Sequence, residues 1–177
     1  QIILKKMPEA LPATSKGKLQ SVHIGTTATI QGENFTVKVT DGKIVSLRFD
    51  GKEYLKTPLK PNYFRALIDN DFSLTNFVPF LIPLHPYYTW RTATDTAQGT
   101  ITAIDEGANG EIIIYVDWAV FSFSGVKSKY IIYPDGKIEV NHEGTPKAFT
   151  LLRFGTQMGL IPELNYVKWY GRGPQET

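Results

Sequence analysis

Four short turn signals divide this chain into hairpins, and they limit its fold more than any other feature. Asp41-Gly42 and Asp50-Gly51 lie nine residues apart, Asn109-Gly110 comes later, and residues 134–136 read Pro-Asp-Gly. Such pairs favour tight hairpin turns, because the central positions need positive φ angles that Gly, Asn and Asp accept most readily. The two Asp-Gly turns therefore predict a β-meander with no helix between them.

Between the turns, apolar and polar residues alternate with the two-residue period of strands. In the segment 44–49, Val45, Leu47 and Phe49 are expected to share one face. Residues 112–116 are apolar without alternation, so we expect the segment around them to be the most deeply buried strand. The expected strands cover residues 22–30, 35–40, 44–49, 99–106, 111–123, 127–133, 137–142 and 149–159. This pattern predicts an all-β fold, an antiparallel β-sandwich.

Residues 71–91 carry many aromatic residues and three prolines, Pro79, Pro83 and Pro86. The prolines argue against a continuous helix and against a central strand, so we expect a long irregular loop. Two interpretations remain open for it. It is either a flap that covers one end of the sandwich or a binding loop.

Composition narrows the function classes. A chain of 177 residues suits one domain that buries about 70% of its unfolded surface. The formal net charge is +2, from 19 basic and 17 acidic residues without clusters, which argues against nucleic acid or a membrane surface as a partner. There is no cysteine, so disulfides and thiolate metal sites are excluded, while the compartment, bacterial cytoplasm or periplasm, stays open.

The most particular stretch is residues 165–177, which read NYVKWYGRGPQET. Large side chains alternate on both faces of the expected strand 167–171, and two glycines and a proline come after them. Arg172 adds a guanidinium with several N–H donors, and Glu176 adds a carboxylate, beside the rings of Trp169 and Tyr170. Aromatic faces next to charged hydrogen-bonding groups predict a sugar-facing surface.

Residues 167–176 resemble the WYGRGPxEN signature in the C-terminal domain of family 2 β-galactosidases of the LacZ type. Residues 62–71, NYFRALIDND, resemble the FxRAPxDND block upstream in that domain, and residues 153–155 and 160–162 resemble the stretch before the signature. Leu67 departs from the usual Pro and Thr177 from the usual Asn.

The resemblance implies that residues 20–177 are the N-terminal part of a C-terminal domain of the small-chain type, a truncated supersandwich similar to galactose mutarotases. Residues 1–19 would be the end of a preceding sandwich domain and a linker. The parent would hydrolyse terminal β-D-galactosides with retention, using glutamates of an upstream (β/α)-barrel. Mg and Na, where the parent uses them, would be bound through other domains, so no cofactor is expected in this chain.

Eight residues are carried over as motif positions that either face carbohydrate or pack. They are Arg65, Asp69, Asn70, Asp71, Trp169, Tyr170, Arg172 and Glu176. No catalytic residue is assigned, because retaining hydrolysis needs two carboxylates about 5 Å apart and no such pair stands out. No metal site is assigned either. Asp69 and Asp71 lack the rest of a calcium loop, and His23, His85 and His142 are scattered.

The sequence supports two hypotheses for function. The first is a non-catalytic scaffold domain of a β-galactosidase, whose partners are the remaining domains, a galactoside ligand and further copies of the chain. The second is an independent carbohydrate-binding or aldose-epimerase-like module. The expected strand 167–171 would also leave an unpaired edge, which predicts either edge-to-edge association or coverage by residues 71–91.

Overall fold

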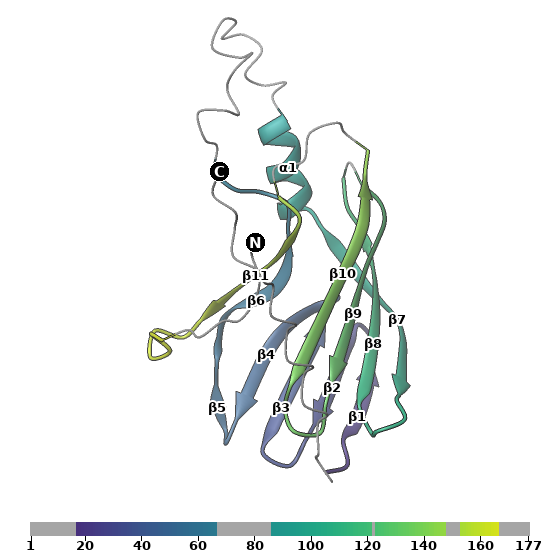
Figure 1. Cartoon of the computed structure of the whole chain (residues 1–177), viewed down its shortest axis with the longest axis vertical. Helices are drawn as coiled ribbons and strands as arrows, with labels where there is room; N and C mark the ends of the chain where they lie inside the picture. Colours follow the sequence, from purple (N-terminus) through teal and green to yellow (C-terminus); the bar gives the residue numbers. More distant parts are fainter. Residues whose placement is uncertain (1–16, 67–85, 122, 148–152, 167–177) are drawn as a thin grey trace, which may run out of the picture.

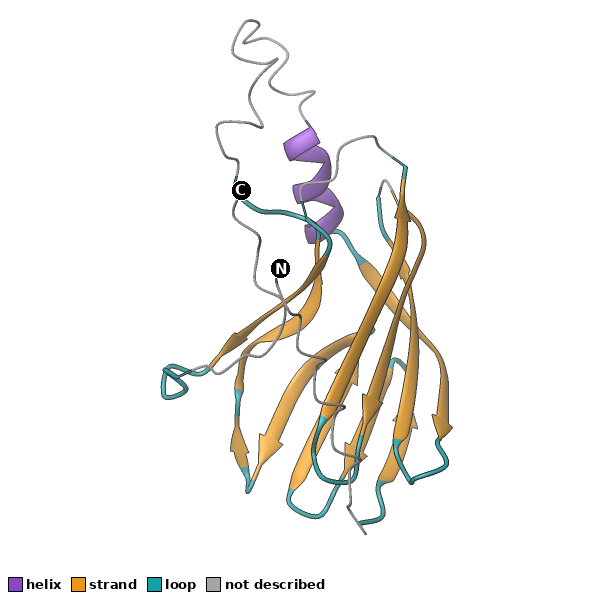
Figure 2. Cartoon of the chain, in the orientation of Figure 1, coloured by secondary structure: helices purple, strands orange, loops and turns teal. Residues whose placement is uncertain are grey.

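The computed structural model of the protein describes residues 17–66, 86–121, 123–147 and 153–166. Within them, the strands form two antiparallel sheets of seven and four strands, with one helix at an end of the molecule (Figure 1 and Figure 2). The predicted antiparallel β-sandwich is confirmed.

The larger sheet has the order β1-β2-β3-β4-β6-β11, and the short β5 pairs with β4. Strands β1 to β6 form a meander, and β11 joins it beside β6 after the chain has formed the smaller sheet. Its strands are β1 (Gln20–Ile24), β2 (Thr27–Gln31), β3 (Phe35–Thr40), β4 (Lys43–Phe49), β5 (Lys52–Glu53), β6 (Leu55–Asn62) and β11 (Gly155–Leu160). Both predicted Asp-Gly turns are present. Their φ angles are positive at both positions, 48° and 73° at Asp41-Gly42 and 48° and 76° at Asp50-Gly51. Two consecutive positive φ angles define the hairpin turn that matches strand twist.

The smaller sheet has the order β10-β9-β8-β7. Its strands are β7 (Gln98–Glu106), β8 (Ile112–Ala119), β9 (Phe123–Ile132) and β10 (Ile138–Pro146). The Asn109-Gly110 and Pro-Asp-Gly signals form the turns that were predicted, with φ angles of 80° at Gly110 and 85° at Gly136. In Figure 1 this sheet, with β10 foremost, lies against the larger one.

The core lies between the two sheets and takes side chains from both inner faces. Ala28, Ile30, Val37 and Val39 of the larger sheet are fully buried. The smaller sheet contributes Ile112, Ile114, Val116, Trp118, Val126, Tyr130 and Ile132 to the same cluster. The alternation of these residues with exposed ones is the two-residue period that the sequence shows.

The predictions for the segments 22–30 and 44–49 were wrong in detail. The segment 22–30 is two strands, because Gly25 turns the chain with a φ of 59°, and Val22 and Ile24 are exposed while Ala28 and Ile30 are buried. In β4 the register with β3 shifts between Lys38 and Val39, so Ile44 is buried in the core and Val45 does not share the face of Leu47 and Phe49. An extra residue in one strand reverses which face the later side chains of that strand occupy.

The segment 111–123 also divides, since β8 ends at Ala119 and β9 begins at Phe123. Residues 112–119 alternate between buried and less buried positions, so β8 buries one face rather than two. The apolar run reflects a half-exposed outer face at Ile113 and Tyr115. The last expected strand, 149–159, appears as β11 from Gly155; residues 148–152 lie outside the described part.

The expected loop 71–91 is wrong over its last residues, where α1 (Pro86–Asp95) begins. Pro86 occupies the first helical position, where its missing N–H costs nothing and its fixed φ suits the helix. Trp90, Ala93 and Thr94 of α1 are buried at helical spacing, so the amphipathic face outweighs the proline signal. Residues 67–85, which hold the other two prolines, are outside the described part.

Candidate functional site

Arg65 is the one predicted site residue that lies within the described part of the chain. It comes after β6, is half-buried, and its Nη1 donates to the carbonyl oxygen of Ala66 at 3.0 Å. The other seven lie outside the described residues, so their sugar-facing or packing roles stay predictions. They are Asp69, Asn70, Asp71, Trp169, Tyr170, Arg172 and Glu176.

The segment just before Arg65 is fixed by hydrogen bonds to helix α1. The backbone amide of Tyr63 donates to Thr94 Oγ1 at 2.9 Å, and that hydroxyl donates to the carbonyl of Trp90 at 3.0 Å. Asn62 Oδ1 accepts from the amide of Phe64 at 3.0 Å. The chain after β6 is therefore held to the helix by polar contacts as well as by packing.

A polar network crosses from this segment to the smaller sheet. Tyr63 Oη lies 2.9 Å from His142 Nε2, Ser128 Oγ lies 2.8 Å from His142 Nδ1, and Trp118 Nε1 donates to Ser128 Oγ at 2.9 Å. An indole N–H can only donate, so Ser128 Oγ accepts from Trp118. A neutral imidazole has one donor and one acceptor nitrogen, so it can satisfy Ser128 and Tyr63 at the same time.

Burial keeps the titratable members of this network neutral. Desolvation lowers the pKa of His142 below its ordinary value of 6.5, and a hydrogen bond with the backbone of Lys127 opposes that shift. Desolvation, reinforced by neighbouring Tyr130, raises the pKa of Tyr63. Desolvation also raises the pKa of Tyr130 to about 12, against a hydrogen bond from Ser128, while its hydroxyl donates to the carbonyl of Gly42 at 2.8 Å. The contacts of Tyr63 with His142 and of Tyr130 with Gly42 therefore join the two sheets through uncharged groups.

Aromatic rings enclose the same histidine. Phe154 stacks on His142 with ring centroids 4.9 Å apart, and Tyr63 contacts Phe123 at 4.4 Å. Trp90 of α1 meets Phe123 edge-on at 5.1 Å. Sequence reasoning left His142 among scattered histidines and missed this role. The sequence did hold one signal for this role. Side chains two residues apart on a strand share a face, so His142 lies on the inner face of β10 with Ile138 and Val140.

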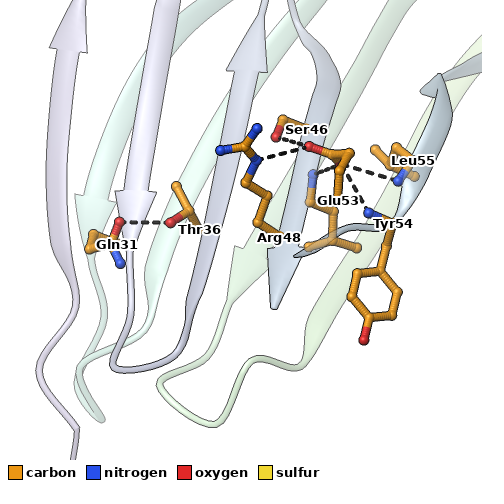
Figure 3. A network of polar contacts seen from close by, with 8 residues as sticks. Gln31, Thr36, Ser46, Arg48, Glu53, Tyr54 and Leu55 are labelled. Carbon is orange, nitrogen blue, oxygen red and sulfur yellow. Dashed lines mark hydrogen bonds and ion pairs between the residues drawn. The ribbon is translucent and has the colours of Figure 1, made fainter. Parts of the chain in front are cut away.

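A second polar cluster, at the β4–β5 corner, is shown in Figure 3. Glu53 Oε1 accepts the backbone amides of Leu47, Tyr54 and Leu55 at 2.8, 3.2 and 3.1 Å, and Oε2 accepts the Ser46 hydroxyl at 2.5 Å. Arg48 Nε lies 3.4 Å from Oε2. Partial burial alone would raise the pKa of Glu53, but the hydrogen bond from Ser46 and those from the three amides outweigh it and lower the pKa to about 2.

Glu53 therefore stabilises a corner of the larger sheet, because both of its carboxylate oxygens accept hydrogen bonds from the protein.

Among the described residues, no three His, Asp or Glu side chains converge in a way that could hold a metal ion. In the same part of the chain, no helix has the length and apolar character needed to span a bilayer.

Comparison with known proteins gives consistent matches. The family model described as "Beta galactosidase small chain" matches residues 30–177. A β-galactosidase of Halalkalibacterium halodurans is 26% identical over 171 residues, which cover 92% of this chain and 16% of that protein. A β-galactosidase of Clostridium acetobutylicum is 27% identical over 183 residues, which cover 100% of this chain and 20% of that protein.

A β-galactosidase of Streptococcus thermophilus is 25% identical over 182 residues and is covered to 17% of its length. The chain thus spans between 16% and 20% of the length of these three relatives. The match extends over the hairpins, the helix and the motif blocks described above. Because the family model covers most of the sequence, this chain belongs to the β-galactosidase small chain family.

Proposed function

We propose that this chain is a non-catalytic scaffold domain of a longer β-galactosidase of glycoside hydrolase family 2. The observation that carries the proposal is its place among relatives that are five to six times its length and bear the name β-galactosidase. The whole enzyme would hydrolyse terminal β-D-galactosides with retention of configuration. Its two catalytic carboxylates would come from another domain.

The chemistry of the described residues supports a structural role. Retaining hydrolysis needs one carboxylate free to attack and a second that carries a proton, about 5 Å apart. The most strongly hydrogen-bonded carboxylate here, Glu53, is held ionised by four donors and faces no partner carboxylate in those contacts. The half-buried His142 contacts Ser128 and Tyr63 through its two ring nitrogens. Polar networks whose members are satisfied internally make a fold more rigid, which is the contribution expected of a scaffold.

The partners proposed for the domain are the remaining domains of the enzyme and further copies of the chain. Mg and Na, where the enzyme uses them, would be held by those other domains. The division between a linker at 1–19 and the domain at 20–177 stays a prediction. An independent carbohydrate-binding or epimerase-like module is the alternative, and the alignment within much longer β-galactosidases favours the scaffold role over it.

The test is an activity assay on the purified 177-residue chain with a chromogenic β-galactoside. We expect no hydrolysis above buffer. Glu176→Gln serves as the specific control, because Glu176 is the carboxylate of the signature motif. Turnover that is present in the unmodified chain and lost in Glu176→Gln would overturn the proposal, since it would place a catalytic carboxylate in this domain.

A further inference from the structure

The outer face of the smaller sheet carries a groove that the scaffold role does not use. Its volume is about 780 Å³, and it lies over β7, β8, β9 and β10. Its lining includes seven partly or fully exposed polar residues, Thr102, Tyr115, Asp117, Lys127, Lys129, Asn141 and Glu143, together with Ala103, Val116, Ser128 and His142. We refer to it below as the outer groove. Its volume falls in the range of about 300 to 1,000 Å³ that is usual for small-molecule sites.

Strand register arranges these side chains in two rows. Tyr115 pairs with Lys129, and Lys129 pairs with Asn141, which gives one row across three strands. Two residues further along each strand, Asp117 pairs with Lys127, and Lys127 pairs with Glu143. Paired residues lie about 5 Å apart and the rows about 7 Å apart, so the two rows cover an area suited to one or two sugar rings.

The charges of the outer groove balance and are not engaged with each other. Asp117 and Glu143 oppose Lys127 and Lys129, two negative groups against two positive ones. The ion pairs of the described residues, Arg48 with Glu53 and Arg91 with Asp95, include none of these four. A groove without net charge favours a neutral ligand over a phosphate, and it offers both acceptors and donors to hydroxyl groups.

Tyr115 supplies the apolar surface that such a ligand needs. Its ring is half-buried on the outer face, and the ammonium of Lys129 lies 5.8 Å from the ring centre. That distance is close to the limit for a cation–π contact, so the lysine covers the ring only loosely. A sugar that stacks its C–H groups on the ring would place its hydroxyls within reach of Lys129 and Asn141.

We propose that the outer groove is a binding site for a neutral saccharide, with Tyr115 as the stacking platform and Asp117, Lys129 and Asn141 as hydroxyl-binding groups. The site binds sugar without cleaving it. It does not depend on the scaffold role, because binding and hydrolysis are measured separately and each proposal can fail alone.

The experiment is a titration of the whole chain with lactose, monitored by backbone amide NMR shifts. We expect saturable shifts at residues 115–117, 127–129 and 141–143. Tyr115→Val keeps a strand-forming residue but removes the ring, and Asp117→Asn removes one charged acceptor while keeping its shape. Each variant should weaken lactose binding about fivefold to tenfold, as expected for one lost contact of about 1 kcal/mol.

Tyr133→Val is the matched control, because Tyr133 also has a lysine over its ring, with Lys137 Nζ 4.5 Å from the centroid, but does not line the outer groove. It should leave lactose affinity unchanged. Titration with inorganic phosphate should give no saturable shifts at these amides. The proposal is overturned if lactose gives no saturable shifts, if the shifts fall on another face, if phosphate binds in its place, or if Tyr133→Val weakens binding as much as Tyr115→Val does.

Discussion

His142 links the smaller sheet to Tyr63, just after β6, through Nε2, and contacts Ser128 of the neighbouring strand β9 through Nδ1. A neutral ring has one acceptor nitrogen for these two contacts, and a second ring proton would remove that acceptor. The folded-state pKa of His142 is lowered, from an ordinary value of 6.5, by burial. The unfolded chain therefore binds the proton first as pH falls, and stability is lost below about pH 6.5.

We expect the free energy of unfolding to be flat above pH 7 and to fall by up to about 1.4 kcal/mol per pH unit between pH 6.5 and the folded-state pKa. Urea denaturation from pH 5 to 8 measures this slope. His142→Gln should flatten it and lower stability at pH 7 by about 1 to 3 kcal/mol. His23→Gln is the control, because His23 is exposed on β1. Equal slopes in the unmodified chain and in His142→Gln would contradict the assignment.

Glu53 titrates in a different window. Burial opposes ionisation, but the Ser46 hydroxyl and three backbone amides lower its pKa from 4.5 to about 2. A lowered acid pKa means that the contribution to stability is complete above about pH 5 and is lost as pH falls toward 2. The side chain is 32% exposed, so we reduce the expected contribution to about 1 to 2 kcal/mol.

Glu53→Gln should therefore lower the urea midpoint at pH 7 and weaken the dependence of stability on pH between 5 and 2. Glu33→Gln is the control, since Glu33 is an exposed carboxylate in a loop of the same sheet. If Glu53→Gln kept the full stability at pH 7 and the same acid dependence, the three amide contacts would contribute nothing measurable to the corner.

At the scale of elements, the two Asp-Gly turns form a natural comparison. Gly42 and Gly51 occupy equivalent turn positions with φ angles of 73° and 76°. A Cβ at Gly51 would meet nothing within 4 Å, whereas one at Gly42 would lie 2.5 Å from Val116 Cγ1 and 3.0 Å from Gly99 Cα. The turn at Gly51 has open space around it, whereas the turn at Gly42 is where the two sheets approach each other closely.

Gly51→Ala should cost about 1 to 2 kcal/mol, the penalty for an L-residue at positive φ. Gly42→Ala should cost about 1 to 3 kcal/mol more, because the added methyl group must displace Val116 or the backbone of β7. Thermal or urea unfolding of the two variants isolates the packing contribution, since the φ penalty is shared. Equal losses in the two would show that the sheets separate easily at this end.

The same elements show what sequence could and could not predict. The turns were predictable because Asp-Gly and Asn-Gly act locally, and the buried faces of β3 and β9 are a direct result of alternation. The break at Gly25 and the register shift beside Val45 were not, because a single glycine or an extra residue leaves the apolar pattern nearly intact. The helix α1 was missed because the proline penalty disappears at a first helical position, and only its packing reveals that position.

At the scale of the whole molecule, the site was less predictable than the fold. The Tyr63–His142 contact joins residues 79 positions apart, and Tyr130 reaches the carbonyl of Gly42 across 88. Nothing local marks such pairs, because they exist only after the two sheets stack. The motif residues were predictable as a group by resemblance, yet of the eight only Arg65 falls in the described part. The network around Tyr63 therefore comes from the structure alone.

The edge strands of the larger sheet are the parts of the molecule best suited to pair with a second copy of the chain. Among the residues that the structure describes, β1 and β11 are the edge strands of this sheet, and β1 is exposed along its full length, with Val22 and Ile24 56% and 75% exposed. Its sequence, QSVHI, holds no Lys, Glu or Pro that would discourage pairing with a second copy. The opposite edge, β11, has a single large apolar side chain of this kind, Met158, at 52% exposure.

We therefore expect the chain to associate reversibly through β1 as its concentration rises, because pairing satisfies the free backbone groups and covers both apolar side chains. Size exclusion with light scattering over a wide concentration range measures the apparent mass. Ile24→Lys places a charge on the edge and should weaken association about tenfold or more, whereas Met158→Lys should leave it unchanged. A mass that stays monomeric at every concentration would rule out association. If Met158→Lys had the larger effect, the copies would instead meet through β11, and the apolar exposure of β1 would need another explanation.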